Sequence, residues 1–402
     1  MNHKLATAVA VAVMWLPSPR LTAQQSVTRA QAVAAALSRG ARVALGRADT
    51  TAARGLARSA RAFPNPVLSA SYTKDLPRYH AVIDVPLDLP WLRGARIGAA
   101  ESAREAAQLG FTFERAVVRF DVETTYTNAL AAARHAELSR RTALDADSLF
   151  RIAELRRQVG DASELDVRLA AVNAGQLENI AADDSLTAVS ALLALQLQMG
   201  LAADAPSIVL ADSLEPPDST AVLSEHPLLP IAAAEASLHS AQRTLALTRR
   251  SRFAPSLELG FDTGDPSSPT PHQLLPVAGF SFPLPLFNRS GGEVLRAAAE
   301  RDRAQAQLDL TRRETTAAVA AARRTLAAAR ARLSRGAALV ESANRVAVMS
   351  LRAYSEGAAA LASVLEAQRN AREVLARYID DLAAADAATR AVRLLTTSPE
   401  EP

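Results

Sequence analysis

Phe282-Pro283-Leu284-Pro285-Leu286 repeats, in its pattern of apolar residues and proline, the earlier stretch Val85-Pro86-Leu87-Asp88-Leu89. The offset between the two stretches is 197 residues, the difference between 282 and 85. Other residues recur at the same offset without a gap: Gly94 and Gly291, Gly160 and Gly357, Asn173 and Asn370. A constant offset over this distance indicates a duplicated structural unit.

Each unit has the predicted order helix, strand, strand, very long helix, turn and long helix. Apolar and polar residues alternate over 67–73, 82–89, 256–262 and 280–286, and a period of two predicts strands. We expect one face of these strands to be apolar and to point outward. Its predicted members are Leu68, Tyr72, Ile83, Val85, Leu257, Phe261, Phe280 and Phe282.

Long stretches without proline predict the helices. Neither the segment from Gly94 to Gly160 nor the segment from Gly291 to Gly357 contains proline, and both are rich in good helix formers. A helix over 96–159 would be roughly 95 Å long, at about 1.5 Å per residue. We also expect helices over 27–62, with Gly40 as a weak point, and over 162–199, 231–252 and 358–395. This order of elements suits a membrane-anchored tube better than a compact soluble domain.

The N-terminal residues predict a secretory signal peptide over 1–23. Lys4 precedes an apolar run that ends at Leu16, and Leu21-Thr22-Ala23 offers a small-residue cleavage site. The remaining domain bounds that we expect are a first structural repeat over 24–200, a linker over 201–230, a second repeat over 231–397 and a C-terminal tail over 398–402.

Composition narrows the function classes. The formal net charge is only +3 and includes Lys4 and Arg20 of the signal, which argues against a nucleic-acid partner. The chain has no cysteine, so disulfides and cysteine nucleophiles are excluded. The six histidines show no zinc-ligand spacing, and we expect no metal site, no cofactor and no enzymatic activity. Asp183-Asp184 and Asp380-Asp381 are interpreted as solvated helix faces.

After the signal, no stretch reaches about 18 consecutive apolar residues, so a transmembrane helix is not expected. A chain of this kind can cross a membrane only as a closed β-barrel, because open strand edges in lipid leave backbone groups without hydrogen bonds. Four short strands cannot close a barrel. Three chains with four strands each would provide twelve strands, and association therefore solves the edge problem.

Several segments resemble TolC-like outer-membrane efflux proteins, in the same order along nearly the whole mature chain. They are Phe63-Pro64-Asn65-Pro66-Val67-Leu68, the stretch from Phe282 to Gly292, Tyr354-Ser355-Glu356-Gly357 and Val364-Leu365-Glu366-Ala367-Gln368. Pro283 to Arg289, together with Leu92-Arg93-Gly94-Ala95-Arg96, is similar to the cation-efflux (CzcC/CusC-like) branch.

The resemblance implies a mainly α-helical fold with a β-barrel portion. It implies a homotrimer, with a twelve-stranded barrel in outer-membrane lipid that continues as an α-helical tunnel through the periplasm of a Gram-negative-type cell. The protein would be the passive exit duct of a tripartite efflux system, with heavy-metal cations among its expected substrates. A periplasmic adaptor (membrane fusion) protein and an inner-membrane transporter would be its partners.

In this family the helical turns form the periplasmic tip, and the resemblance assigns roles there. The adaptor-docking turns are Gly160-Asp161-Ala162-Ser163 and Gly357-Ala358-Ala359-Ala360. Tyr354 matches a tip tyrosine that helps hold the closed state, while Asp166, Ser363 and Glu366 are candidates for the gate. Ser363 is neutral where relatives often carry a carboxylate, so Glu366 would supply the ring of charge. The alternative for Glu366 is an ordinary surface residue.

A second function class stays open. A periplasmic coiled-coil adaptor or spacer protein, without a channel, would also contain long helices and short strands. An adaptor usually has one helical hairpin between β-domains, whereas this sequence predicts two strand–strand–hairpin units.

Overall fold

The structure is a computed structural model that describes residues 25–75, 77–217, 228–251, 255–263, 274–282, 284, 287 and 289–398. The predicted signal peptide lies outside these residues. So do Pro283, Pro285, Leu286 and Asn288 of the repeated stretch, part of the predicted linker and all but the first residue of the predicted tail. The expected domain bounds stay a prediction.

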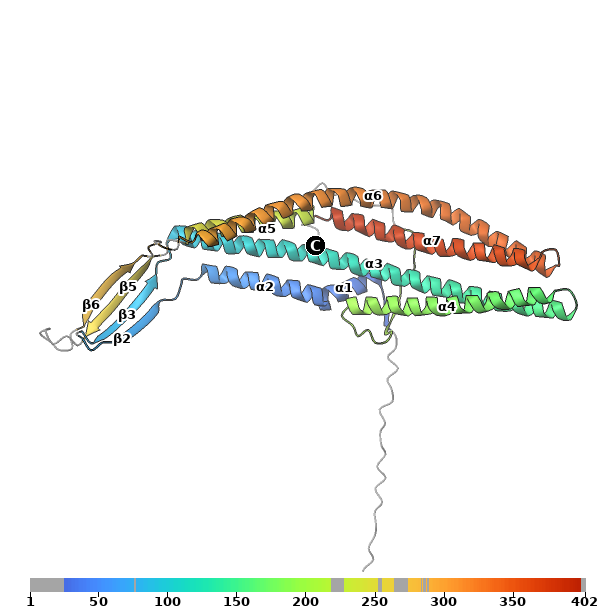
Figure 1. The fold of residues 1–402 in the computed structure, drawn as a ribbon, viewed down its shortest axis with the longest axis horizontal. Helices are drawn as coiled ribbons and strands as arrows, with labels where there is room; N and C mark the ends of the chain where they lie inside the picture. The colour runs from blue at the N-terminus through green and yellow to red at the C-terminus, as the bar shows by residue number, and fades with distance from the viewer. Residues whose placement is uncertain are drawn as a thin grey trace, which may run out of the picture.

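The molecule is an elongated helical body with a small sheet at one end and two helical turns at the other (Figure 1). The helices are α1 (Arg29–Arg39), α2 (Ala41–Arg61), α3 (Pro90–Gln158), α4 (Glu164–Gln198), α5 (Leu229–Arg250), α6 (Gly291–Ser355) and α7 (Leu361–Thr396). The strands are β1 (Gln25–Val27), β2 (Val67–Tyr72), β3 (Tyr79–Pro86), β4 (Ile208–Leu210), β5 (Ser256–Thr263) and β6 (Leu275–Ser281). The 69 residues of α3 span about 100 Å.

The four-stranded sheet is antiparallel, in the order β2-β3-β5-β6. Directly paired residues share a face, and the register aligns Leu68 with Ile83, Ile83 with Leu259, and Leu257 with Phe280. The apolar residues predicted within the strands therefore lie on one face, as expected. The opposite face carries Asp84, Glu258 and Asp262. In the single chain this sheet is open, with β2 and β6 at its edges.

Proline shifts several of the predicted bounds. The fourth strand, expected over 280–286, is β6 at Leu275–Ser281, and the second, expected over 82–89, ends at Pro86. Proline cannot donate to a strand ladder, so Leu87, Asp88 and Leu89 of the first stretch connect β3 to α3 rather than extending the strand. Likewise α3 begins at Pro90, ahead of Gly94, because proline is favoured in the first turn of a helix.

The single helix expected over 27–62 is two helices. Gly40 has an extended backbone (φ −62°, ψ 136°) and separates α1 from α2. Residues 25–27 form β1, which pairs in parallel with β4 of the predicted linker. Near the middle of the body, α1, β1 and β4 pack with α3 and the end of α4 into the largest core cluster, which includes the buried Tyr126 and Leu195.

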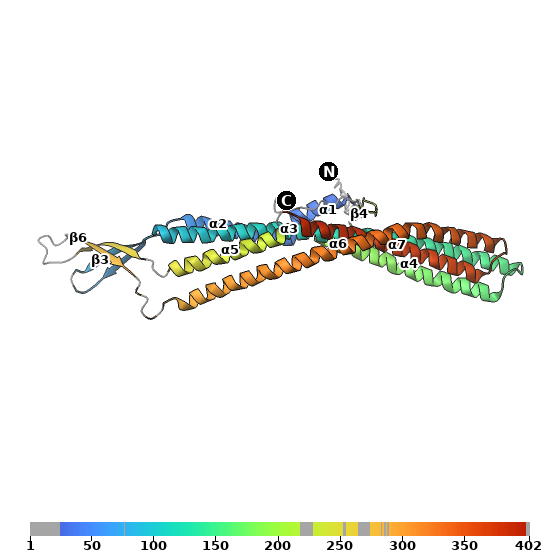
Figure 2. The ribbon, with the colours of Figure 1, turned by 90° about the horizontal axis from the view of Figure 1, so that it is seen from above.

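The helical body has two halves along its length, and the long helices α3 and α6 run through both (Figure 2). In the half near the sheet, α2 packs against α3, α3 against α5, and α5 against α6. In the half near the turns, α4 packs against α3, α3 against α7, and α7 against α6. The outer helices of the turn half are therefore α4 and α6.

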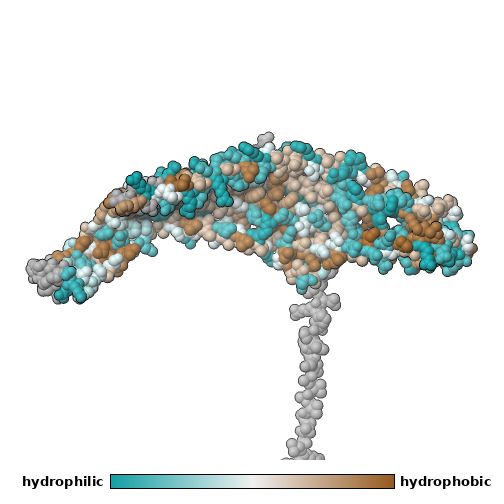
Figure 3. Space-filling view, viewed as in Figure 1, coloured by the Kyte–Doolittle hydropathy of each residue, from teal (hydrophilic) through white to brown (hydrophobic). Residues whose placement is uncertain are grey.

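One of the described helices, α4, is long and apolar enough to cross a membrane, although the sequence criterion predicted none. Its 18-residue window has a mean hydropathy of 1.3 and is only 11% buried. One such helix is weak evidence for a membrane span. Apolar patches are exposed both near the turn end and on the sheet (Figure 3).

Candidate functional site

The two predicted turns lie together at the end of the body farthest from the sheet (Figure 1). Gly160 (φ +86°) and Gly357 (φ +77°) both adopt the left-handed backbone that glycine favours after a helix. The Asp161 amide donates to the Arg156 carbonyl oxygen at 2.8 Å, and the Ala358 amide donates to the Ala353 carbonyl oxygen at 2.8 Å. The repeat therefore places the same helix-ending motif in both turns.

The helices that leave the two turns start differently. In the first, the Ser163 hydroxyl accepts from the Asp166 amide (3.1 Å), and the Asp166 carboxylate accepts from the Ser163 amide (3.0 Å). This capping box satisfies amides that otherwise lack partners at a helix start. In the second turn Ala360 is the cap residue and forms no side-chain hydrogen bond. The gate candidate Asp166 thus completes the capping box of α4, a contact that its counterpart Ser363 does not reproduce on α7.

A small apolar core ties the two hairpins together at the tip. It contains residues from all four helices: Leu149 and Ala153 of α3, Val167 and Ala170 of α4, Tyr354 of α6, and Leu361 and Val364 of α7. Because these residues come from both repeats, one hairpin cannot move far without exposing the side chains that the other covers.

Arg156 makes the polar link between the hairpins. Its Nη1 donates to the Tyr354 carbonyl oxygen at 2.6 Å, and its guanidinium carbon lies 4.7 Å from the centre of the Tyr354 ring. Its Nη2 also donates to the Asp161 carbonyl oxygen at 3.4 Å. Arg156 therefore joins its own turn to the end of α6. This residue was not predicted, since nothing in the sequence separates it from Arg157.

Tyr354 is 4% exposed, so it packs inside the protomer tip. Its hydroxyl has no hydrogen-bond partner among the described residues. Burial raises the pKa of this hydroxyl, an effect that the nearby positive charge of Arg156 partly opposes. The ring, rather than the hydroxyl, accounts for the contacts of Tyr354 within one chain.

Glu366 and Ser363 are exposed on α7. The Glu366 carboxylate accepts from Arg369 at 3.0 Å and from Asn370 at 3.3 Å. Arg369 also lies 3.8 Å from Glu373. The negative charge of Glu366 therefore has a cation beside it, and any ring of Glu366 side chains would carry three nearby arginines.

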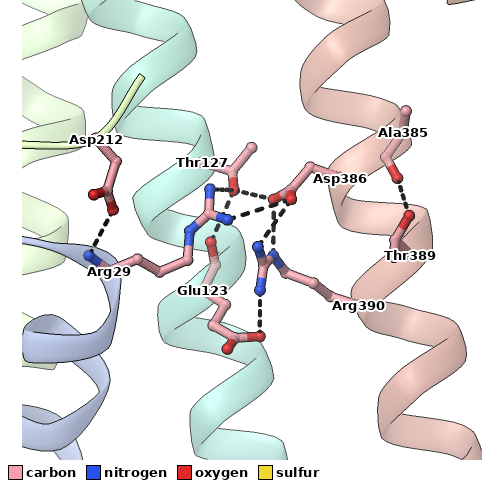
Figure 4. A network of polar contacts seen from close by, with 8 residues as sticks. All are labelled: Arg29, Glu123, Thr127, Asp212, Ala385, Asp386, Thr389 and Arg390. Atoms are coloured by element: carbon pink, nitrogen blue, oxygen red, sulfur yellow. Dashed lines mark hydrogen bonds and ion pairs between the residues drawn. The ribbon is translucent and has the colours of Figure 1, made fainter. Parts of the chain in front are cut away.

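The middle of the body holds a buried polar network that the sequence did not predict (Figure 4). Arg390 donates two hydrogen bonds to Asp386 (2.8 and 2.9 Å) and lies 2.8 Å from Glu123. Thr127 donates to Asp386 and accepts from Arg29 at 3.1 Å. The positive charges of two arginines balance the negative charges of Asp386 and Glu123, and the network connects α1, α3 and α7. The Asp386 and Arg390 spacing of four residues was the one available signal.

Burial opposes ionisation of Asp386. The hydrogen bonds from Arg390 and Thr127 outweigh this effect of burial, so the pKa of the Asp386 carboxyl lies below its usual range.

The interpretation of Asp380-Asp381 as a solvated face is wrong for Asp381, which is buried and lies 2.8 Å from Arg332. The Asp380 carboxylate accepts from the Nε2 atom of His135 at 2.8 Å. A cavity of about 530 Å³ beside this pair is also lined by Asp184.

Comparisons with known proteins agree on one family. The model of the family described as outer membrane efflux protein matches residues 222–398, most of the second repeated unit. The cobalt-zinc-cadmium resistance protein CzcC of Cupriavidus metallidurans is 28% identical over 254 residues. That match covers 61% of this chain and spans only 60% of the length of CzcC.

Two solved structures share nearly the whole fold. A membrane protein from Pseudomonas aeruginosa has a TM-score of 0.76 at 20% identity, over 91% of this chain and 93% of its own. CusC, studied for its folding and transmembrane channel formation, has a TM-score of 0.76 at 16% identity and covers 96% of each chain. At these identities the likeness concerns the fold.

Proposed function

Because the chain belongs to the TolC-like outer membrane efflux protein family, we propose that it is the outer-membrane exit duct of a tripartite efflux system. Substrates pass through it from an inner-membrane pump, across the periplasm and out of the cell. The duct is passive and performs no covalent chemistry.

One observation carries this proposal: an open sheet with an exposed apolar face continues directly into helices about 100 Å long. Leu68 and Phe280 lie on that face and are more than 60% exposed. Exposed apolar residues opposite a polar face are what a membrane-spanning barrel requires. Three copies that join β2 to β6 form a twelve-stranded barrel without open edges.

The helical body then forms a tunnel, and the two turns form its periplasmic tip. Gly160-Asp161-Ala162-Ser163 and Gly357-Ala358-Ala359-Ala360 dock the adaptor. Tyr354, Asp166, Ser363 and Glu366 take part in closing the tip, together with Arg156. The compact contacts of Tyr354 with α3 and α7 support a closed tip in which each chain holds its own two hairpins together.

Divalent metal cations are the proposed substrates. CzcC, the curated relative, is named for resistance to cobalt, zinc and cadmium. The polar face of the sheet offers a second argument. Among the described strand residues on that face are Asp84, Glu258 and Asp262, and none is lysine or arginine. A lumen lined in this way attracts cations and disfavours anions.

A deletion strain tests both parts of the proposal. We expect the strain to become sensitive to cobalt, zinc or cadmium, and a plasmid copy to restore resistance. The protein itself should fractionate with the outer membrane and migrate differently on gels with and without heating. Recovery in the soluble periplasmic fraction would favour the adaptor or spacer function instead. The two helical hairpins of this chain argue against that alternative.

A further inference from the structure

The turn half of the body has two unpaired edges. Contacts there run from α4 through α3 and α7 to α6, so α4 and α6 are the outermost helices. In a closed ring of copies, α4 of one copy must therefore lie beside α6 of the next. This inference rests on the trimer of the proposed function.

Contacts within the chain show which residues of the two edges lie at the same height along the body. Arg332 of α6 pairs with Asp381 of α7, and the adjacent Asp380 pairs with His135 of α3. His135 lines the same cavity as Asp184 of α4. Because rotation about the tube axis preserves height, the α6 edge near Arg332 of one copy meets the α4 edge near Asp184 of the next.

Charges at this height are complementary. Arg335 is one turn beyond Arg332 on α6, and Asp183 precedes Asp184 on α4. Both residues are exposed, and within the part of the chain that the structure describes neither side chain forms an ion pair. The acidic residue on one edge and the basic residue on the other are therefore both available to a neighbouring copy.

Nearer the tip, both edges are apolar. The tip core brings Val167 and Ala170 of α4 to the height of Tyr354 of α6. Val172, five residues after Val167 on α4, is 61% exposed, and Met349, five residues before Tyr354 on α6, is 66% exposed. Exposed apolar surface at matching height on both edges favours a contact between them.

We propose that α4 of one copy docks against α6 of a second copy, with Val172 against Met349 near the tip and an Asp183–Arg335 ion pair nearer the middle. The occupant of each edge is another molecule of this same chain. The exposed apolar surface of α4 is then part of an assembly interface rather than a membrane span.

Disulfide trapping tests the apolar contact, and the absence of native cysteine makes it specific. The full chain carrying both V172C and M349C, purified in detergent and oxidised, should give covalent dimers and trimers that reductant returns to monomers. Disulfide formation requires Cα atoms about 4.4–6.8 Å apart. The matched control pairs V172C with R324C, which lies on α6 about 38 Å from Met349 at 1.5 Å per residue. The control pair should stay monomeric on the denaturing gel.

A charge swap tests the ion pair independently. Asp183→Arg should lower the temperature at which the trimer dissociates, and Arg335→Asp in the same chain should restore it. A native mass of three chains without V172C–M349C cross-links, or with equal cross-linking of the control, would overturn this docking while leaving the trimer intact. A native mass of one chain would overturn the proposed trimer, and the interface with it.

Discussion

The guanidinium of Arg156 lies over the ring of Tyr354, with 4.7 Å between the guanidinium carbon and the ring centre, and it donates a 2.6 Å hydrogen bond to the Tyr354 carbonyl oxygen. Arg156 belongs to the first repeat and Tyr354 to the second, and their contact lies at the tip. The pair therefore fastens the second hairpin to the first, which is the contact that an opening tip would have to break.

Arg156→Ala should loosen the tip. A hydrogen bond from a charged group contributes about 1.5–3 kcal/mol, and the contact with the ring is lost as well. In planar bilayers we expect a higher conductance or more frequent opening. Arg157→Ala is the matched control, because Arg157 lies on the exposed surface, where its guanidinium is 3.5 Å from the Glu164 carboxylate. If both variants had the same conductance as the wild type, Arg156 would not contribute to closing the tip.

Tyr354→Phe should leave the conductance nearly unchanged, because the Tyr354 hydroxyl has no partner among the described residues. Tyr354→Ala should instead destabilise the tip by about 3–5 kcal/mol, since it empties a buried aromatic site. If Tyr354→Phe opened the channel as much as Tyr354→Ala, the hydroxyl would have to bond a neighbouring copy.

Glu366→Gln should shift ion preference toward anions, because it removes three carboxylates and leaves the Arg369 charges in place. The reversal potential in a salt gradient measures this preference. Glu373→Gln is a control on the same helix, 3.8 Å from the same arginine. A reversal potential that is unchanged in Glu366→Gln, or changed equally in both variants, would place Glu366 away from the constriction.

Asp386→Asn should destabilise the middle of the body. Removing one partner from a buried ion pair costs about 3–5 kcal/mol, and Arg390 would keep only Glu123 of its two acidic partners among the described residues. The folded-state pKa of Asp386 is lowered, so its stabilisation is present above the usual Asp pKa of about 3.9 and is lost as pH falls through the folded value.

Wild type and the Asp386→Asn variant should therefore differ in unfolding temperature at pH 7, and the difference should be smaller at a pH below the usual Asp pKa of about 3.9. A difference of the same size at both pH values would mean that the charge of Asp386 is not what stabilises the fold.

Ile83→Arg should impair assembly in the membrane, whereas Asp84→Arg should be tolerated. The two residues are adjacent in β3 but lie on opposite faces of the sheet. Arginine on the lipid face of a barrel costs about 2–4 kcal/mol near mid-membrane. The amount of heat-modifiable oligomer in the outer membrane reports the effect. Equal tolerance of the two variants would contradict a barrel whose apolar face points outward.

Much of the fold could be predicted because it depends on periodic patterns. Alternation placed Leu68, Ile83 and Leu257 on one face, and the absence of proline predicted both long helices. Bounds were less predictable where proline acts locally. Pro86 and Pro90 end a strand and begin a helix several residues before the positions that the alternation and Gly94 indicated.

The tip contacts could be predicted only in part. Glycine at 160 and 357 shows where each chain reversal occurs, because the left-handed backbone favours that residue. The contact between Arg156 and Tyr354, by contrast, depends on how two hairpins from different repeats pack. The same holds for Asp386 and Thr127, which are 259 positions apart. A single sequence does not contain this information about distant pairs.

The native mass of the protein extracted from the outer membrane tests the central claim most directly. If the chain is an exit duct, its sheet closes only through association, and the extracted particle should have the mass of three mature chains in mild detergent. A folded particle with the mass of one chain, or recovery of the protein only in the soluble periplasmic fraction, would contradict the account.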